Sequence, residues 1–166
     1  MKKVLFVCLI LFIAGIACKK EDIGGGGLCA CSPITGPQLD LVIKNTAGDD
    51  LLDPKIAGAY SKDKIQLYRK YANGKVVPVD FTIRPTFLYN TEKFNYQTLH
   101  AEAYSALQAS ADNIMYLNLG GDKIYELKLI LTQQKYNLDR LLIDNQDAEK
   151  DKSNVAKYVT IFYLTK

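Results

Sequence analysis

The stretch IQLYRKYANGKVVPVDFTIR, residues 65–84, contains two runs of alternating apolar and polar side chains on either side of Asn73-Gly74. Asn-Gly between alternating runs is the strongest short signal for a β-hairpin, because both central turn positions need a positive φ. The stretch therefore predicts two strands, residues 65–71 and 76–84, joined by a tight turn.

The second of these strands has one apolar face. The side chains on that face are Val77, Val79, Phe81 and Ile83, and those on the other are Val76, Pro78, Asp80, Thr82 and Arg84. Proline has no N–H to donate to a neighbouring strand, so the position of Pro78 indicates an edge strand there.

The rest of the chain from residue 39 onward repeats this pattern. A second hairpin is predicted between residues 113–119 and 123–131 across Gly120-Gly121-Asp122. Its return strand carries Tyr125, Leu127, Leu129 and Leu131 on one face and Glu126 and Lys128 on the other. Further strands are predicted at residues 39–44, 138–143 and 157–164.

One segment departs from the β pattern. Residues 96–110 contain Tyr96, Leu99, Ala103 and Leu107 at helical spacing. We interpret this segment as one short helix, although a long connection between strands would look similar.

Seven or so short strands with Gly and Pro at the turns predict an all-β domain. The expected architecture is an antiparallel β-sandwich, immunoglobulin-like or transthyretin-like, with at most one short helix near residues 96–110. A small closed barrel is the alternative, because periodicity does not distinguish the two.

The first residues have the pattern of a secretory signal. Lys2 and Lys3 precede an apolar run from Val4 to Ala17. This run is shorter than the roughly 20 apolar residues of a membrane-spanning helix, and it ends in small residues.

The end of that run, Gly15-Ile16-Ala17-Cys18, resembles the lipobox of bacterial lipoproteins. The resemblance implies cleavage between Ala17 and Cys18 and acylation of Cys18. Gly15 departs from the Leu that usually stands three positions before the cysteine. The alternative is an ordinary secretory signal followed by a coincidental cysteine.

Charged residues follow the cysteine. Lys20, Glu21 and Asp22 resemble the surface-export tag of lipoproteins from Bacteroidetes-type bacteria, and the alternative is a plain solvated tether. The tag implies an outer-membrane lipoprotein at the cell surface, with the periplasmic face as the alternative location. We expect a signal peptide at residues 1–17, a lipid-anchored flexible tether at 18–33 and a β-sandwich domain at 34–166.

The charge balance excludes one class of partner. The full chain has a formal net charge of +3, which falls to +1 when Lys2 and Lys3 leave with the signal. Because no basic field remains, we expect no nucleic-acid partner.

Cys29 and Cys31 remain after the signal and the lipidated cysteine are set aside. They could form a local disulfide, a redox pair or part of a metal site. A structural zinc site needs four ligands, and the chain has one histidine in total. We therefore favour an oxidised or idle pair in the tether and expect neither a bound metal nor a cofactor.

That histidine, His100, could act in acid–base catalysis with Glu102, but no nucleophile motif accompanies it. We expect His100 on the surface, whereas Val79, Phe81, Leu127 and Leu129 are expected in the core.

Two acidic loops could contribute calcium ligands, although neither follows the EF-hand pattern. Their members are Asp49, Asp50 and Asp53 in one loop and Asp144, Asp147, Glu149 and Asp151 in the other.

Tyr68 is expected on the outer face of its strand with Gln66 and Lys70. Exposed aromatic side chains can stack on sugars or contact a partner protein, although tyrosine is also simply a good strand residue.

Taken as a whole, the chain resembles small Bacteroidetes-type surface lipoproteins of uncharacterised function. That resemblance implies a membrane contact through lipid, an envelope protein or glycan as partner, and a non-enzymatic binding or structural role. The alternative is a redox or metal-handling envelope lipoprotein that uses Cys29 and Cys31.

Overall fold

The structure is a computed structural model that describes residues 36–89, 91–103, 112–132 and 137–166. By its internal contacts the chain divides into two units, Met1–Ile34 and Thr35–Lys166. The expected signal peptide, the expected lipidation site Cys18, the expected export tag and the Cys29/Cys31 pair lie outside the described residues.

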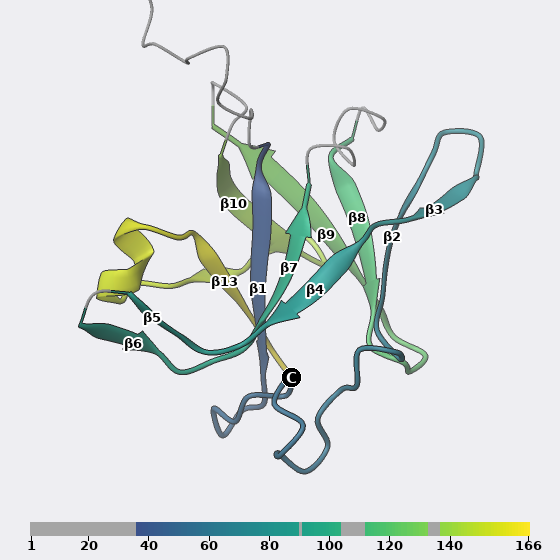
Figure 1. The fold of residues 1–166 in the computed structure, drawn as a ribbon. Coiled ribbons are helices and arrows are strands. Elements are labelled where there is room, and N and C mark those ends of the chain that lie inside the picture. Colours follow the sequence, from purple (N-terminus) through teal and green to yellow (C-terminus); the bar gives the residue numbers. More distant parts are fainter. Residues whose placement is uncertain (1–35, 90, 104–111, 133–136) are drawn as a thin grey trace, which may run out of the picture. The chain divides into compact units, whose positions relative to one another are not determined.

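Two main sheets form the described part, and in Figure 1 the six-stranded sheet lies behind the five-stranded one. The five-stranded sheet has the order β12-β13-β1-β7-β4, with β1 (Gln38–Lys44), β4 (Phe81–Arg84), β7 (Thr98–Glu102), β12 (Glu149–Lys150) and β13 (Ile161–Thr165). The six-stranded sheet has the order β11-β10-β9-β8-β2-β3, with β2 (Gln66–Lys70), β3 (Val76–Pro78), β8 (Ile114–Asn118), β9 (Ile124–Leu131), β10 (Leu138–Ile143) and β11 (Gln146–Asp147). Among the named strands, only the β1–β13 pair is parallel. The all-β, sandwich-like fold expected from the sequence is confirmed.

The main core lies between these two sheets. Leu39, Leu41 and Leu99 enter it from the five-stranded sheet, and Leu127 and Leu129 enter it from the six-stranded sheet. The strict alternation of the strands places these side chains on one face and their neighbours on the other. Val79, Leu127 and Leu129 are buried as expected, whereas Phe81 is only half-buried at the edge of the core.

The single strand expected over residues 76–84 is in fact two strands in different sheets. β3 pairs with β2, and β4 pairs with β7. The chain crosses from one sheet to the other at Val79-Asp80, where the Val79 N–H still donates to the Leu67 carbonyl at 2.8 Å. Such crossings form the corners of sandwiches. Pro78 lies on β3, which is an edge strand as predicted.

The hairpin between β2 and β3 is confirmed, but its turn differs from the expected one. The Gly74 N–H donates to the Tyr71 carbonyl at 2.8 Å, and the Tyr71 N–H donates to the Lys75 carbonyl at 2.9 Å. Gly74 has a φ of +80°, whereas Asn73 is not among the residues with positive φ. This is the three-residue loop in which only the glycine takes the left-handed conformation.

A third layer covers the outer face of the five-stranded sheet at β1 and β13. It contains the two-stranded sheet of β5 (Phe87–Tyr89) and β6 (Glu92–Phe94) together with the 3-10 helix η1 (Asn154–Lys157). Val42 of β1, Phe94 of β6 and Val155 of η1 meet there in a second apolar cluster. Figure 1 shows β5, β6 and η1 gathered on the left. β1 is therefore covered on both faces, which explains why five consecutive residues of it are buried.

The helix predicted over residues 96–110 is wrong for the part of that segment that the structure describes. Residues Thr98–Glu102 form β7, the strand between β1 and β4, and residues 104–111 lie outside the described ranges. Pairing with two neighbouring strands satisfies the backbone of this segment and outweighs its local preference. Within the described residues, no helix has the length and apolar character needed to cross a membrane.

Candidate functional site

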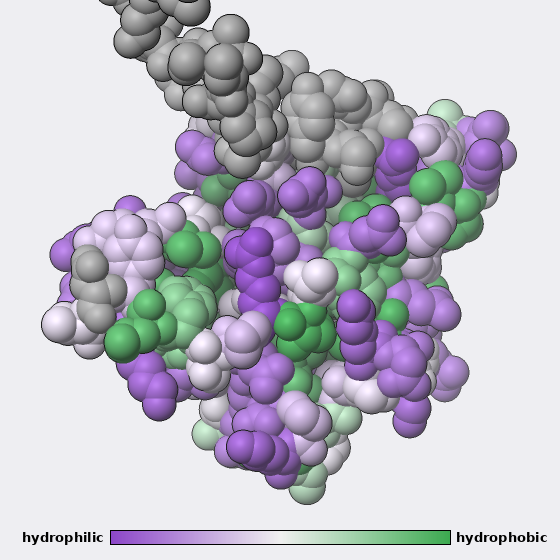
Figure 2. All heavy atoms as spheres, viewed as in Figure 1, coloured by the Kyte–Doolittle hydropathy of each residue, from purple (hydrophilic) through white to green (hydrophobic). Residues whose placement is uncertain are grey.

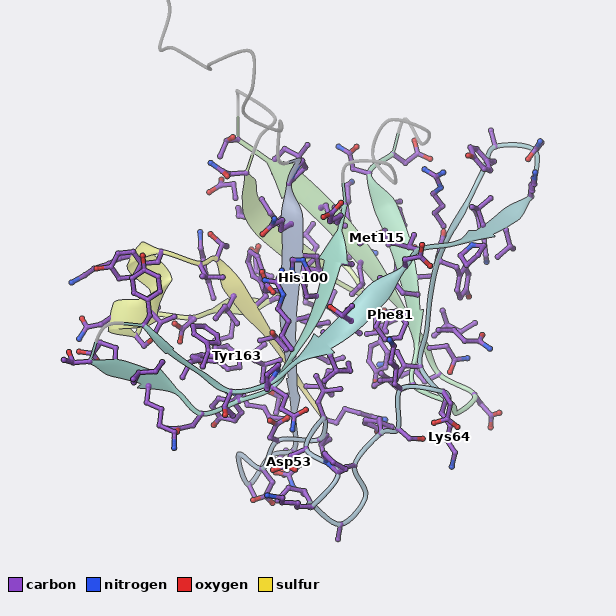
Figure 3. The ribbon with its side chains drawn as sticks, viewed as in Figure 1. Asp53, Lys64, Phe81, His100, Met115 and Tyr163 are labelled. Atoms are coloured by element: carbon purple, nitrogen blue, oxygen red, sulfur yellow. The ribbon has the colours of Figure 1, made fainter. Side chains whose placement is uncertain are left out.

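The candidate site lies on the outer face of the five-stranded sheet, where three polar residues come from three adjacent strands. Asp40 of β1 is the register partner of His100 of β7, and His100 is also the register partner of Thr82 of β4. Arg84 follows two residues after Thr82 and so lies on the same face of β4. Figure 3 shows His100 on β7, between β1 and β4.

His100 bridges an acid and a base. Its Nδ1 lies 2.9 Å from Oδ1 of Asp40, and its Nε2 lies 2.7 Å from Nη2 of Arg84. A guanidinium can only donate hydrogen bonds. The Nε2 atom of His100 must therefore accept the hydrogen bond from Arg84, which leaves Nδ1 to carry the proton and to donate a hydrogen bond to Asp40. The geometry assigns His100 as the neutral Nδ1-protonated tautomer.

Burial corrects the expectation that His100 lies on the surface. His100 is 7% exposed and Asp40 is 3% exposed. Phe87 and Tyr89 of β5 line the same hollow as Asp40, so the third layer borders this part of the sheet. The buried carboxylate has a hydrogen bond from His100 and an ion pair with Arg84, whose Nη1 lies 3.8 Å from Oδ1. Buried charges are retained in proteins when they are paired in this way. The side chain of Arg84 remains 47% exposed, so it is the solvent-facing member of the group.

The suggested pairing of His100 with Glu102 for acid–base catalysis is not supported by the contacts. The two residues share a face of β7, but Glu102 is exposed, and both ring nitrogens of His100 are engaged by Asp40 and Arg84. A general base needs a free lone pair within reach of the proton it removes. This arrangement orients Arg84 instead.

Arg84 borders two hollows in the surface. One has a volume of about 330 Å³, and its lining includes Asp40, Phe87, Tyr89, Val159 and Ile161. The other has a volume of about 490 Å³ and also borders His100 and Glu102. The first hollow lies beside β5, where Figure 2 shows hydrophobic side chains at the left of the molecule.

Aromatic side chains make up much of the covering layer. Phe87 stacks on Phe94 with ring centroids 5.3 Å apart, and Tyr89 stacks on Tyr158 at 4.0 Å. Tyr163 of β13 contacts this group from the sheet, and its hydroxyl donates to Oδ1 of Asp151 at 2.9 Å. Burial, and then this hydrogen bond, raise the pKa of the Tyr163 hydroxyl well above its usual range.

In the described part of the chain, the acids of the two loops do not come together in any group of three or more His, Cys, Asp or Glu side chains that could hold a metal ion. Asp144 accepts from the Glu126 N–H and pairs with Lys123 at 3.0 Å. Asp147 pairs with Arg140 at 2.7 Å, and the hydrogen bonds from Arg140 lower the pKa of its carboxyl.

The remaining acids of these loops also have their own partners. Asp50 accepts from the Gln97 N–H at 2.6 Å, which ties the loop after β1 to the start of β7. Asp49 accepts from Asn45, Asp53 from the Lys55 N–H, Glu149 from Lys44, and Asp151 from Ser153 and Tyr163. These acids stabilise turns and ion pairs.

Tyr68 lies on the outer face of the six-stranded sheet as expected, where it is half-buried. It stacks on Tyr116 of β8, its register partner, with ring centroids 5.6 Å apart. Lys70 lies over the Tyr116 ring at 4.5 Å. One face of the Tyr68 ring is thus taken by a neighbour within the sheet.

Comparisons of the chain with protein-family models, with curated proteins and with solved structures found no match. The candidate site therefore stands on the geometry of Asp40, His100 and Arg84 and on the hollows beside them.

Proposed function

We propose that this chain is a lipid-anchored binding module of the cell envelope and that it has no enzymatic activity. The observation that carries the binding role is the hollow of about 330 Å³ beside β5, which combines apolar side chains with one half-exposed arginine. Small-molecule sites are typically concave, mostly apolar and provided with a few fixed polar groups.

The anchor part of the proposal rests on the sequence Gly15-Ile16-Ala17-Cys18 at the end of the apolar run. Two or more acyl chains on Cys18 would hold the protein at a membrane, because a single chain gives only marginal attachment. Lys20, Glu21 and Asp22 place the protein at the outer surface of the outer membrane in this proposal, with an envelope protein or glycan as a further partner.

Labelling cells with a radioactive fatty acid tests the anchor. The wild-type protein should take up label, and Cys18→Ala should take up none and keep its signal peptide. Cys29→Ala is the matched control, because it removes a cysteine from the same region and should retain the label. Equal label on the wild type and Cys18→Ala would overturn the lipoprotein assignment.

A redox or metal-handling role for Cys29 and Cys31 is the alternative from the sequence. Metal analysis and thiol titration of the purified protein separate it from the binding role. Stoichiometric metal, or a thiol pair that cycles with a mild reductant, would favour the alternative.

A further inference from the structure

Within the part of the chain that the structure describes, only one edge of the Arg84 guanidinium makes contacts with polar side chains. Its Nη2 donates to His100, and its Nη1 faces Asp40 at 3.8 Å. No other hydrogen bond or ion pair of Arg84 is present among the described residues. A guanidinium has five N–H donors in a planar fork, so several donors of Arg84 remain available.

The acid that partners Arg84 does not reach the solvent to the same degree. The side chain of Asp40 is 4% exposed against 47% for Arg84, and its Oδ1 accepts a hydrogen bond from Nδ1 of His100. The charge that a molecule entering the hollow meets is therefore mainly positive. His100 and Asp40 fix the orientation of this charge from behind.

The walls of the hollow are suited to an apolar body. Phe87 and Tyr89 of β5 contribute aromatic rings, and Val159 and Ile161 contribute branched aliphatic groups. A volume of about 330 Å³ is near the lower end of the range for ligand sites, roughly 300–1,000 Å³. A small ligand fits this space better than a polymer.

We propose that the hollow binds a small organic carboxylate, with its carboxylate on the open edge of Arg84 and its apolar body against Phe87 and Tyr89. This proposal deepens the binding role and rests on it. The planar fork of arginine matches the two oxygens of a carboxylate, and such charge-assisted pairs are stronger than neutral hydrogen bonds. His100 is a positioning residue in this site, because it acts on the ligand only through Arg84.

Titration of the full chain, purified in detergent, with phenylacetate and with phenylacetamide tests the ligand class. The two probes share one apolar body and differ in charge. Following both by NMR, we expect saturable shifts at Phe87 and Tyr89, and a phenylacetate Kd roughly tenfold lower than that of the amide, as expected for one charge-assisted contact.

Two arginine variants locate the effect. Arg84→Gln should weaken phenylacetate binding to the level of the amide and leave amide binding within about twofold, since only the charged contact is lost. Arg140→Gln is the control, because Arg140 pairs with Asp147 on β11 in the other sheet and should leave both affinities unchanged. The wild-type comparison of the two probes remains decisive if Arg84→Gln does not fold.

The contradicting results differ for the two proposals. Benzylamine binding more tightly than phenylacetate would show that Asp40 governs the site, and equal affinity for phenylacetate and its amide would show that charge has no role. Either result overturns the carboxylate assignment and leaves a binding hollow. If none of the three probes shifts Phe87 or Tyr89, the hollow is not a small-molecule site, and the binding role itself loses its support.

Discussion

His100 and Asp40 lie opposite each other on the neighbouring strands β7 and β1, and Nδ1 of His100 donates a hydrogen bond to Oδ1 of Asp40 at 2.9 Å on the outer face of the five-stranded sheet. The pair is almost inaccessible to solvent, yet it connects to Arg84, which is half-exposed. A buried polar pair thus supports a solvent-facing charge.

The histidine should be important for stability. His100→Ala leaves the buried Asp40 without its hydrogen bond, which we expect to cost about 2–3 kcal/mol of the free energy of unfolding. Leu127→Ala, in the main core, should cost about 2–5 kcal/mol. Chemical denaturation measures both, and Arg140→Ala, at an exposed ion pair, is the control that should barely move the midpoint. A midpoint for His100→Ala equal to that of the control would mean that the network contributes nothing.

The strand that carries His100 can be predicted from the sequence. Thr98, His100 and Glu102 alternate with Leu99, Ala101 and Ala103, which is the period of a strand with one buried face. The helical spacing of Tyr96, Leu99 and Ala103 uses some of the same apolar residues, so both periods fit this short segment. The tertiary pairing with β1 and β4 decides between them.

The burial of Asp40 cannot be predicted from the local pattern of apolar and polar residues. Its own strand reads as alternating, with Leu39 and Leu41 on the core face, and this pattern predicts that Asp40 faces solvent. The residues that line the hollow beside it include Phe87 and Tyr89 of β5 and Ile161 of β13, which come from far away in the chain. Long-range pairing with His100 and Arg84, together with the nearby β5 residues, turns this outward-facing position into a buried one.

Alkaline pH should destabilise the protein partly through Tyr163. Its pKa in the folded protein is raised above the value of about 10 for an unfolded tyrosine, because the hydroxyl is buried and donates to Asp151. Its contribution to stability is therefore fully present below pH 10 and is lost as the pH rises toward the folded pKa. Tyr163→Phe should show a shallower decline of the unfolding free energy above pH 10. Parallel curves for the two proteins would contradict the shift.

The turn between β2 and β3 should depend on one glycine. Gly74 has a φ of +80°, and a side chain placed there meets no other atom within 4 Å, so the cost of a substitution is backbone strain alone. Gly74→Ala should destabilise the protein by about 1–2 kcal/mol. Gly121→Ala is the matched control, since Gly121 also has open space around it and its φ is not in the left-handed region. Equal unfolding midpoints for the two variants would show that the turn tolerates a side chain.

The segment before the domain should be dispensable for folding. Residues 18–33 contain four consecutive glycines and a charged flank, which cannot bury enough apolar area to offset the entropy of ordering. A chain that begins at Pro33 should melt cooperatively at nearly the temperature of the chain that begins at Cys18. Loss of cooperative melting on this truncation would show that residues 18–33 belong to the core.

The central claim is that a neutral His100 accepts a hydrogen bond from Arg84 at Nε2 and donates a hydrogen bond to Asp40 from Nδ1. Because the chain has one histidine, its imidazole nitrogens can be assigned without ambiguity in a ¹⁵N NMR spectrum. At neutral pH we expect Nδ1 to show the shift of a protonated nitrogen and Nε2 the shift of an unprotonated acceptor, and Arg84→Gln should move mainly the Nε2 resonance. A proton on Nε2, or an imidazole averaged between tautomers as in a free peptide, would contradict the claim.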